Sequence, residues 1–255
     1  HGGMGCVQFE GVRLSQLLRR LEIDVDKQAR YFTAEGRDEA VSGKQDFEHS
    51  LPVDEALNRS ILALRLNGQD LPAIHGGPVR LVTPGIYGTM HLKWLSKLNF
   101  TGEESQNENH ARRYRVPKRR IQPGEEFTAD LNNSRFNWRM NVKSVVLSPA
   151  PGAEVKAGSN TIRGVAFNDG AAPIDVVLVS TDGGSSWRKA NVEKAAGPFA
   201  WWPWSLQVEL PQGKQTILAR AVDALGRSQP TQGSIRWNPS GYEWNGVEPI
   251  TVMVS

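Results

Sequence analysis

Residues 75–93 contain the densest group of side chains able to bind or transform a charged ligand. The stretch opens with His75-Gly76-Gly77-Pro78-Val79-Arg80 and closes with His91-Leu92-Lys93. Glycine lets a backbone approach a ligand closely and present N–H groups to an oxyanion. Arginine offers a two-pronged donor to phosphate, and lysine offers a point charge. The stretch therefore predicts a cradle for an anionic, phosphate-bearing cofactor; the alternative is a strand–turn–helix corner with solvated charges.

Residues 112–120 form a second charged group, with six basic residues among nine. A nucleic-acid surface needs a broader basic face with stacking aromatics, and this run holds only Tyr114. A solvated loop is the common explanation of such a run, and a positive rim that draws small anions toward an active site is another. Neither G-x-G-x-x-G nor G-x-x-x-x-G-K-[ST] occurs, so nothing supports a dinucleotide site or a P-loop.

A third group is aromatic and runs from Phe199 to Trp204, with three tryptophans at positions 201, 202 and 204. Tryptophan clusters usually anchor a core or an interface, and a ligand platform is the alternative. Trp202 and Trp204 would share one face of a strand, with Trp201 on the other.

Composition limits the classes of protein to which the chain can belong. It has 255 residues, enough for one large domain or two ordinary ones, and no apolar run long enough to cross a membrane. The net charge of +3 argues against a polyanion as the main partner. Cys6 is the single cysteine, which excludes an internal disulfide and a C-x-x-C-H haem motif. Because the chain starts at His1, we expect a processed or clipped segment.

The elements that position these groups fall into two parts. All five histidines lie in the first part, which mixes helix and strand patterns and predicts an α+β domain. Leucines recur at helical spacing in Val12–Leu21, residues 53–57 look like the start of a short helix, and Ile61–Leu66 and Val79–Thr83 look like strands. The second part predicts an immunoglobulin-like β-sandwich. Its expected strands are Val142–Leu147, Asn160–Phe167, Ile174–Ser180, Trp204–Leu210 and Gln215–Val222.

Several of these motifs, in this order, resemble the sulfite oxidase family of molybdenum-cofactor enzymes. In the first part they are Gly11–Leu14, Glu35–Asp38, His75–Arg80 and Pro84–Leu95; in the second they are Ser180–Trp187, Ala221–Asp223 and Trp237–Tyr242. The last motif and the opening His1–Gly5 look most like bacterial sulfite dehydrogenases. The resemblance implies a molybdopterin-binding oxidoreductase domain, in its C-terminal portion, over residues 1–138. It implies an Ig-like dimerisation domain over residues 139–255.

The resemblance also implies site residues. Asp38, His75, Arg80, His91 and Lys93 would contact the pterin and its phosphate. Tyr114 falls at the active-site tyrosine of the family, whose phenol would bond the metal oxo group or the substrate. The metal-ligand cysteine of the family lies upstream of the position of His1, so no metal ligand is assigned here. We expect Cys6 to be a small buried packing residue.

By this resemblance, the chain would be an oxidoreductase that transfers oxygen from water to sulfite. Electrons would pass to an external acceptor such as cytochrome c or a haem subunit, and the protein would be a periplasmic homodimer without a nucleic-acid partner. An arginine that many members place in the aromatic motif is absent, and Trp202 stands at about that position. Two alternatives therefore stay open: a family member acting on carrier-bound sulfur, and a non-catalytic fragment used for dimerisation or as a scaffold.

Overall fold

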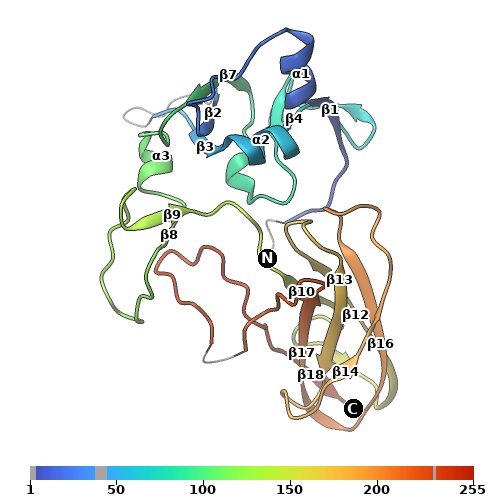
Figure 1. The fold of residues 1–255 in the computed structure, drawn as a ribbon. Coiled ribbons are helices and arrows are strands. Elements are labelled where there is room, and N and C mark those ends of the chain that lie inside the picture. Colours follow the sequence, from blue (N-terminus) through green and yellow to red (C-terminus); the bar gives the residue numbers. More distant parts are fainter. Residues whose placement is uncertain (1–3, 38–44, 232–233) are drawn as a thin grey trace. The chain divides into compact units, whose positions relative to one another are not determined.

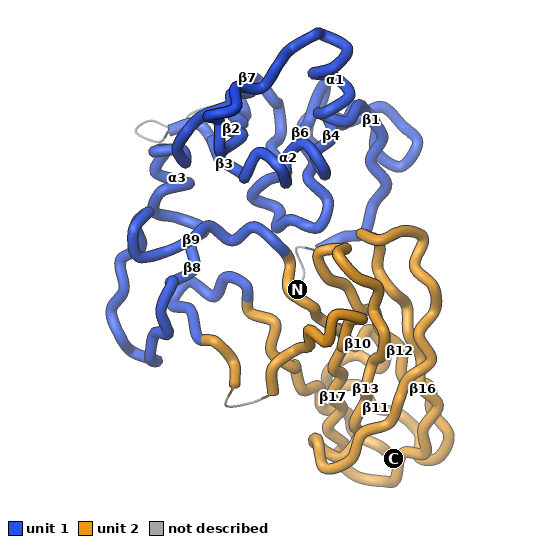
Figure 2. The backbone as a smooth tube through the Cα atoms, viewed as in Figure 1, with its two compact units in different colours: residues 1–139, 237–243 blue, residues 140–236, 244–255 orange. Residues whose placement is uncertain are grey.

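The chain folds into two compact units. A computed structural model describes residues 4–37, 45–231 and 234–255 (Figure 1). Unit 1 comprises residues 1–139 and 237–243, and unit 2 comprises residues 140–236 and 244–255 (Figure 2). The main division falls one residue after the predicted boundary at 138. The short segment 237–243, expected in the second domain, belongs instead to unit 1.

Among its described residues, unit 1 contains three small antiparallel sheets and short helices. The first sheet has the order β1-β4-β5 with β6 also on β4, the second has the order β3-β2-β7, and β8 pairs with β9. The strands are β1 (Phe9–Arg13), β2 (Tyr31–Gly36), β3 (Glu48–Pro52), β4 (Ile61–Leu66), β5 (Gln69–Asp70), β6 (Arg80–Val82), β7 (Leu95–Thr101), β8 (Arg115–Pro117) and β9 (Ser134–Phe136). The helices are α1 (Leu14–Arg20), α2 (Val53–Arg59) and α3 (Glu108–Ala111), with 3₁₀ turns η1 (Ala73–His75) and η2 (Gly88–Met90).

One apolar cluster holds unit 1 together. Helix α1 buries Leu14 and Leu18, which are four residues apart and so lie on one helical face. They join Phe32 from β2, Leu81 from β6 and other buried side chains in a single core. The core also includes Met90 and Leu92 from the predicted cofactor cradle, so ordinary packing fixes the backbone of that stretch.

Unit 2 is a sandwich of two sheets. One sheet has the order β10-β12-β16-β15, and the other has the order β11-β18-β17-β13-β14. The strands are β10 (Lys143–Ser148), β11 (Glu154–Val155), β12 (Gly158–Phe167), β13 (Ile174–Ser180), β14 (Arg188–Lys189), β15 (Asn191–Val192), β16 (Trp202–Leu210), β17 (Gly213–Asp223) and β18 (Ile250–Val254). All of these pairings are antiparallel except β11 with β18. The predicted α+β part followed by an all-β part is confirmed.

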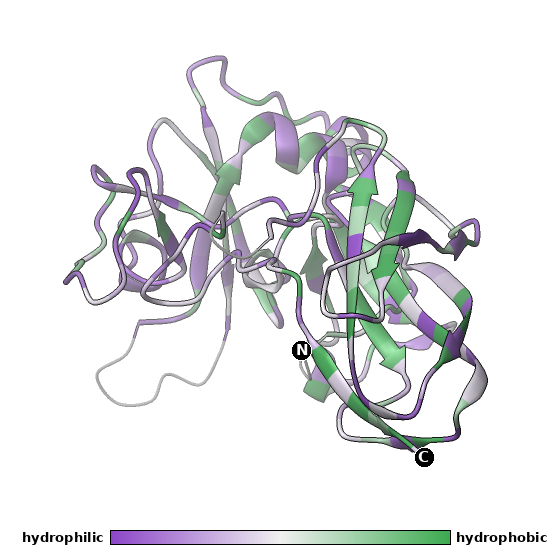
Figure 3. Cartoon of the chain, turned by 90° about the horizontal axis from the view of Figure 1, so that it is seen from below, coloured by the Kyte–Doolittle hydropathy of each residue, from purple (hydrophilic) through white to green (hydrophobic). Residues whose placement is uncertain are grey.

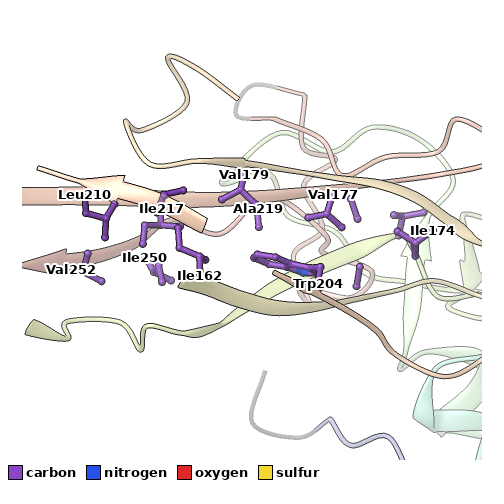
Figure 4. Packing of buried hydrophobic residues seen from close by; sticks show 14 of the residues in the cluster. Ile162, Ile174, Val177, Val179, Trp204, Leu210, Ile217, Ala219, Ile250 and Val252 are labelled. Atoms are coloured by element: carbon purple, nitrogen blue, oxygen red, sulfur yellow. The ribbon is translucent and has the colours of Figure 1, made fainter. Parts of the chain in front are cut away.

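Buried apolar side chains of the two sheets build the core of the sandwich (Figure 4). Figure 3 colours the chain by hydropathy, and hydrophobic residues occupy much of the strands of this unit. Trp204 lies at the centre of this core and is 1% exposed. It lies against Gly164 of β12, where an added Cβ would approach the indole to 2.2 Å, so only glycine leaves room for this ring. Trp202 packs on the same core, while Trp201 stacks on Phe167 with ring centroids 6.5 Å apart. Two of the three tryptophans are thus core residues.

Within the described ranges, no helix combines the length and the apolar character needed to cross a membrane.

Candidate functional site

Two loops of unit 1 that carry residues of the predicted cradle lie side by side. The turn η1 ends at Gly76, whose φ of 101° is in the left-handed region that favours glycine. An added Cβ on Gly76 would come within 2.8 Å of the Lys93 Cα, so the loops approach as closely as backbones allow. The Trp94 N–H donates to the Gly76 carbonyl (3.1 Å), and the Leu95 N–H donates to the Val79 carbonyl (3.0 Å). Residues 73–80 and 91–95 are therefore joined into one tightly packed pair of loops.

The charged ends of Arg80 and Lys93 meet at neighbouring carbonyls. Arg80 donates from Nη1 to the His75 carbonyl (3.1 Å) and from Nε to the His91 carbonyl (3.2 Å). Lys93 donates from Nζ to the Ile74 carbonyl (2.9 Å). Burial lowers the pKa of Arg80, which still leaves an arginine charged at neutral pH. Two cations with unused donor hydrogens thus converge beside the exposed His75.

His91 has a different environment. Its Nε2 lies 3.0 Å from the Thr83 carbonyl, and burial lowers the pKa of the imidazole to about 4. The ring is therefore neutral at pH 7 and donates its Nε2 hydrogen to Thr83. The contact between His91 and a pterin stays a prediction. Asp38, the remaining predicted cofactor residue, lies outside the described residues.

Tyr114 belongs to the same core as the cradle. It is half-buried and packs on the cluster that contains Met90 and Leu92. Its ring stands edge-on to His49 (5.5 Å between centroids) and Phe47 (5.9 Å). Its backbone φ is 52°, in the left-handed region that non-glycine residues rarely enter. Such strain often accompanies functional residues, which makes Tyr114 a candidate on its own geometry.

A buried ionic network next to Tyr114 was missed by sequence reasoning. Arg115 is 2% exposed and donates to the Glu104 carboxylate (3.1 Å), the Ser134 hydroxyl (2.8 Å) and the carbonyls of Ser134 (2.9 Å) and His110 (3.0 Å). The Ser50 N–H donates to His110 Nδ1 at 3.2 Å. His110 therefore carries its hydrogen on Nε2 and donates it to Glu104 at 3.0 Å. This network fixes the start of β8 and with it the backbone that carries Tyr114.

His49 is fully buried, and neither of its ring nitrogens has a hydrogen-bond partner among the described residues. Burial, followed by the nearby His110, lowers the pKa of His49 well below its usual value, so the ring is neutral. Aromatic rings surround it, Phe47 at 4.3 Å and Phe136 at 4.8 Å, between the ionic network and Tyr114.

The chemistry of the donor set fits a phosphorylated cofactor. Arg80 and Lys93 supply positive charge, an added Cβ on Gly88 would meet no atom within 4 Å, and the buried Thr89 hydroxyl has no partner among the described residues. An anion bound beside Arg80 and Lys93 would accept hydrogen bonds from both side chains. No group of three or more metal-ligating side chains occurs in the described ranges. Cys6 is exposed, so the expectation that it is a buried packing residue is wrong.

Arg80→Ala is expected to reduce cofactor retention. A hydrogen bond from a charged donor contributes about 1.5–3 kcal/mol, so the bound cofactor content of the purified protein should fall by about tenfold or more at limiting supply. Molybdenum and oxidised pterin per chain measure this. Arg65→Ala, which removes an exposed arginine from β4 of the same unit, is the matched control. Equal cofactor contents in the two variants would contradict a phosphate role for Arg80.

Comparison with known proteins agrees with this fold. Residues 1–109 match the oxidoreductase molybdopterin binding domain, and residues 134–248 match the Mo-co oxidoreductase dimerisation domain. The fold and the site thus define a molybdopterin-binding oxidoreductase domain joined to a dimerisation domain. The chain belongs to the sulfite oxidase family.

The relatives differ in what their names say they act on. The mitochondrial sulfite oxidase of Macaca fascicularis is 30% identical over 264 residues, covering 100% of this chain and 48% of that protein. Nitrate reductase [NADH] 1 of Phaseolus vulgaris is 29% identical over 94% of this chain and 29% of its own length. The crystal structure of the sulfane dehydrogenase SoxCD from Paracoccus pantotrophus has a TM-score of 0.81 and 29% identity, covering 96% of this chain and 60% of that chain. The chain spans about half the length of the sulfite oxidases that it matches.

Proposed function

We propose that the chain acts in a molybdenum-cofactor oxidoreductase that oxidises sulfite to sulfate. The observation that carries the proposal is the convergence of Arg80 and Lys93 on the carbonyls of residues 74 and 75, inside the region that matches the molybdopterin-binding domain. Sulfite and water give sulfate, two protons and two electrons. The electrons pass to an external acceptor such as cytochrome c or a haem subunit.

The residues of the chain have separate tasks in this proposal. The bound cofactor supplies the centre that delivers oxygen and accepts two electrons. Arg80 and Lys93 neutralise its phosphate, and the exposed His75 lies beside them. His91, neutral and held by Thr83, keeps the loop after β6 in shape without adding charge. Tyr114 offers a phenol hydrogen to the oxyanion, and the exposed Arg112 and Arg113 attract the anion electrostatically.

Tyr114→Phe is expected to keep the fold and cofactor content while slowing sulfite oxidation by about 10²-fold in kcat/KM. The reason is that a donor aimed at developing negative charge contributes roughly this much. Steady-state assays with sulfite and cytochrome c on the cofactor-loaded, full-length protein measure the change. Arg65→Ala, at an exposed position of β4 in the same unit, is the control. Unchanged turnover in Tyr114→Phe would exclude this role.

Two further properties belong to the proposal. Unit 2, which matches the dimerisation domain, would pair two copies of the chain, and the family resemblance favours the periplasm as the compartment. We expect light scattering at micromolar concentration to give about twice the chain mass of 28.2 kDa. A monomer under these conditions would contradict the homodimer.

A second candidate function is oxidation of sulfur bound to a carrier protein. The similarity to a sulfane dehydrogenase over 96% of this chain favours it. Parallel assays with free sulfite and with a protein-bound persulfide separate the two substrates. The third alternative, a non-catalytic scaffold, predicts less than one molybdenum per ten chains in the full-length protein, and elemental analysis measures that ratio directly.

A further inference from the structure

A segment from near the end of the sequence completes unit 1. Residues 237–243 follow most of the sandwich in sequence yet belong to unit 1 (Figure 2). Glu243 anchors the segment because its carboxylate accepts two hydrogen bonds from Arg135 of β9, both 2.6 Å long. The Glu243 side chain is 11% exposed and that of Arg135 is 42% exposed, so the carboxylate is largely shielded from water while the guanidinium is partly open. Such pairs fix geometry as well as adding energy.

The anchored segment places Tyr242 against Tyr114. The two ring centroids are 5.4 Å apart with 47° between the ring planes. A positive φ at a non-glycine residue costs free energy and persists only where surrounding contacts hold it. The Tyr114 ring has His49, Phe47 and Phe136 as edge-on neighbours, and Tyr242 is a further aromatic contact.

The electrostatics agree with this close approach. Burial raises the pKa of the Tyr242 phenol, and the phenol of Tyr114 raises it further. A backbone hydrogen bond from Tyr114 and the charge of Arg113 act in the opposite direction. Tyr242 therefore stays neutral at working pH, and its ring contacts the ring of Tyr114.

We propose that Tyr242 is a positioning residue for Tyr114, held in place by the Arg135–Glu243 ion pair. This inference rests on the proposed function, in which the Tyr114 phenol contacts the oxyanion. Misplacing a reacting group by about 1 Å can cost on the order of 10²-fold in rate. A residue that packs on the Tyr114 ring and fixes its orientation therefore controls the rate without touching substrate.

Whether Glu243 anchors residues 237–243 can be tested without an activity assay. Trypsin cleaves after Arg236, directly before the segment. In Glu243→Gln the anchor loses its charge, and we expect cleavage at Arg236 to be about tenfold faster because local opening becomes easier. Glu125→Gln removes the partner of the exposed Arg119 in the same unit and should leave the cleavage rate unchanged. Equal rates in Glu243→Gln and wild type would overturn the anchoring step.

The positioning role is tested by a double-mutant cycle on the cofactor-loaded, full-length protein. Tyr242→Ala should lower kcat/KM for sulfite by about tenfold with unchanged cofactor content. Tyr242→Phe keeps the ring contact and should restore at least half of the wild-type value. In the Tyr114→Phe background, Tyr242→Ala should cost less than about threefold, because the group being positioned is already absent.

The outcomes separate the two ideas. Fully additive losses, or a Tyr242→Ala enzyme as fast as wild type, would overturn the positioning role and leave the proposed function standing. A silent Tyr114→Phe would overturn both, since there would be no phenol role to support. A Tyr242→Phe enzyme as slow as Tyr242→Ala would show that the hydroxyl, rather than the ring contact, matters, and would also overturn the proposal as stated.

Discussion

Replacing Arg115 by alanine should destabilise unit 1 by about 3–5 kcal/mol. The expected loss is large because Arg115 is the buried cation that neutralises Glu104, and its removal leaves a carboxylate, a hydroxyl and two carbonyls without their donor. Arg115→Lys keeps the charge but loses the several fixed N–H donors of the guanidinium, so the loss of stability should be smaller than in Arg115→Ala. The midpoint of urea unfolding of the full-length protein measures these changes in stability.

The control for this prediction is Arg119→Ala. Arg119 lies four residues further along the same basic run and pairs with Glu125 at the surface. Exposed ion pairs contribute little, so the unfolding midpoint should hardly move. Similar midpoints for Arg115→Ala and Arg119→Ala would show that the buried network does not stabilise the fold.

Acidification should unfold unit 1 before unit 2. Burial lowers the pKa of His49, His91 and His110, and that of His91 falls to about 4. Unfolded histidines take up protons near pH 6.5 while these folded ones do not. The unfolded state then binds more protons, so stability is lost as the pH falls from about 6.5 toward 4.

Glu104 adds to the same trend at lower pH. Burial alone would raise the pKa of Glu104, but the hydrogen bond from His110 and the charge of Arg115 outweigh it and hold the pKa below its usual value. A carboxylate of this kind stabilises the fold above its unfolded pKa, and that stability is lost as the pH falls through the folded pKa. Unit 2 contains no histidine, so it lacks this loss between pH 6.5 and 4.

Hydrogen exchange read by mass spectrometry distinguishes the two units at pH 7, 5.5 and 4.5. Peptides from β3 should lose protection on acidification while peptides from β17 keep it. His91→Gln still donates to the Thr83 carbonyl but cannot be protonated, so it should weaken the pH dependence. Loss of protection in β17 first, or at the same pH, would refute the prediction.

Local patterns in the sequence predicted most strands of the sandwich and some elements of unit 1. Ile61–Leu66 and Ile174–Ser180 are strands over the ranges expected, because alternating and β-branched residues bounded by turn residues signal a strand without long-range information. Glycines at 76 and 77 predicted a close approach of the backbone to a ligand; in the structure the space beside Gly76 is taken by Lys93 of the chain itself, and the ligand contact stays a prediction. Strands β2 and β3 were not predicted. Strand β3 ends at Pro52 and helix α2 follows directly, so the end of β3 was interpreted as the start of the helix.

The parts of the site that escaped prediction depend on contacts between distant residues. Nothing in the run 112–120 distinguishes Arg115 from its exposed neighbours, because its burial is decided by Glu104 and Ser134. His49 gave no signal either, since an isolated histidine looks the same whether it is buried or solvated. The return of Glu243 to Arg135 spans 108 positions and has no local pattern at all.

The alternation of the chain between the two units has a consequence for cleavage. The backbone leaves unit 1 after Arg139, re-enters it at Trp237 and leaves it again after Glu243. A single cut between Arg139 and Met140 therefore yields a C-terminal fragment that still carries a piece of unit 1. The two fragments should co-purify under native conditions and separate only in denaturant, as complementing halves do. Neither unit can be excised as one uninterrupted stretch of the gene, so the pair is expected to be inherited and exchanged together.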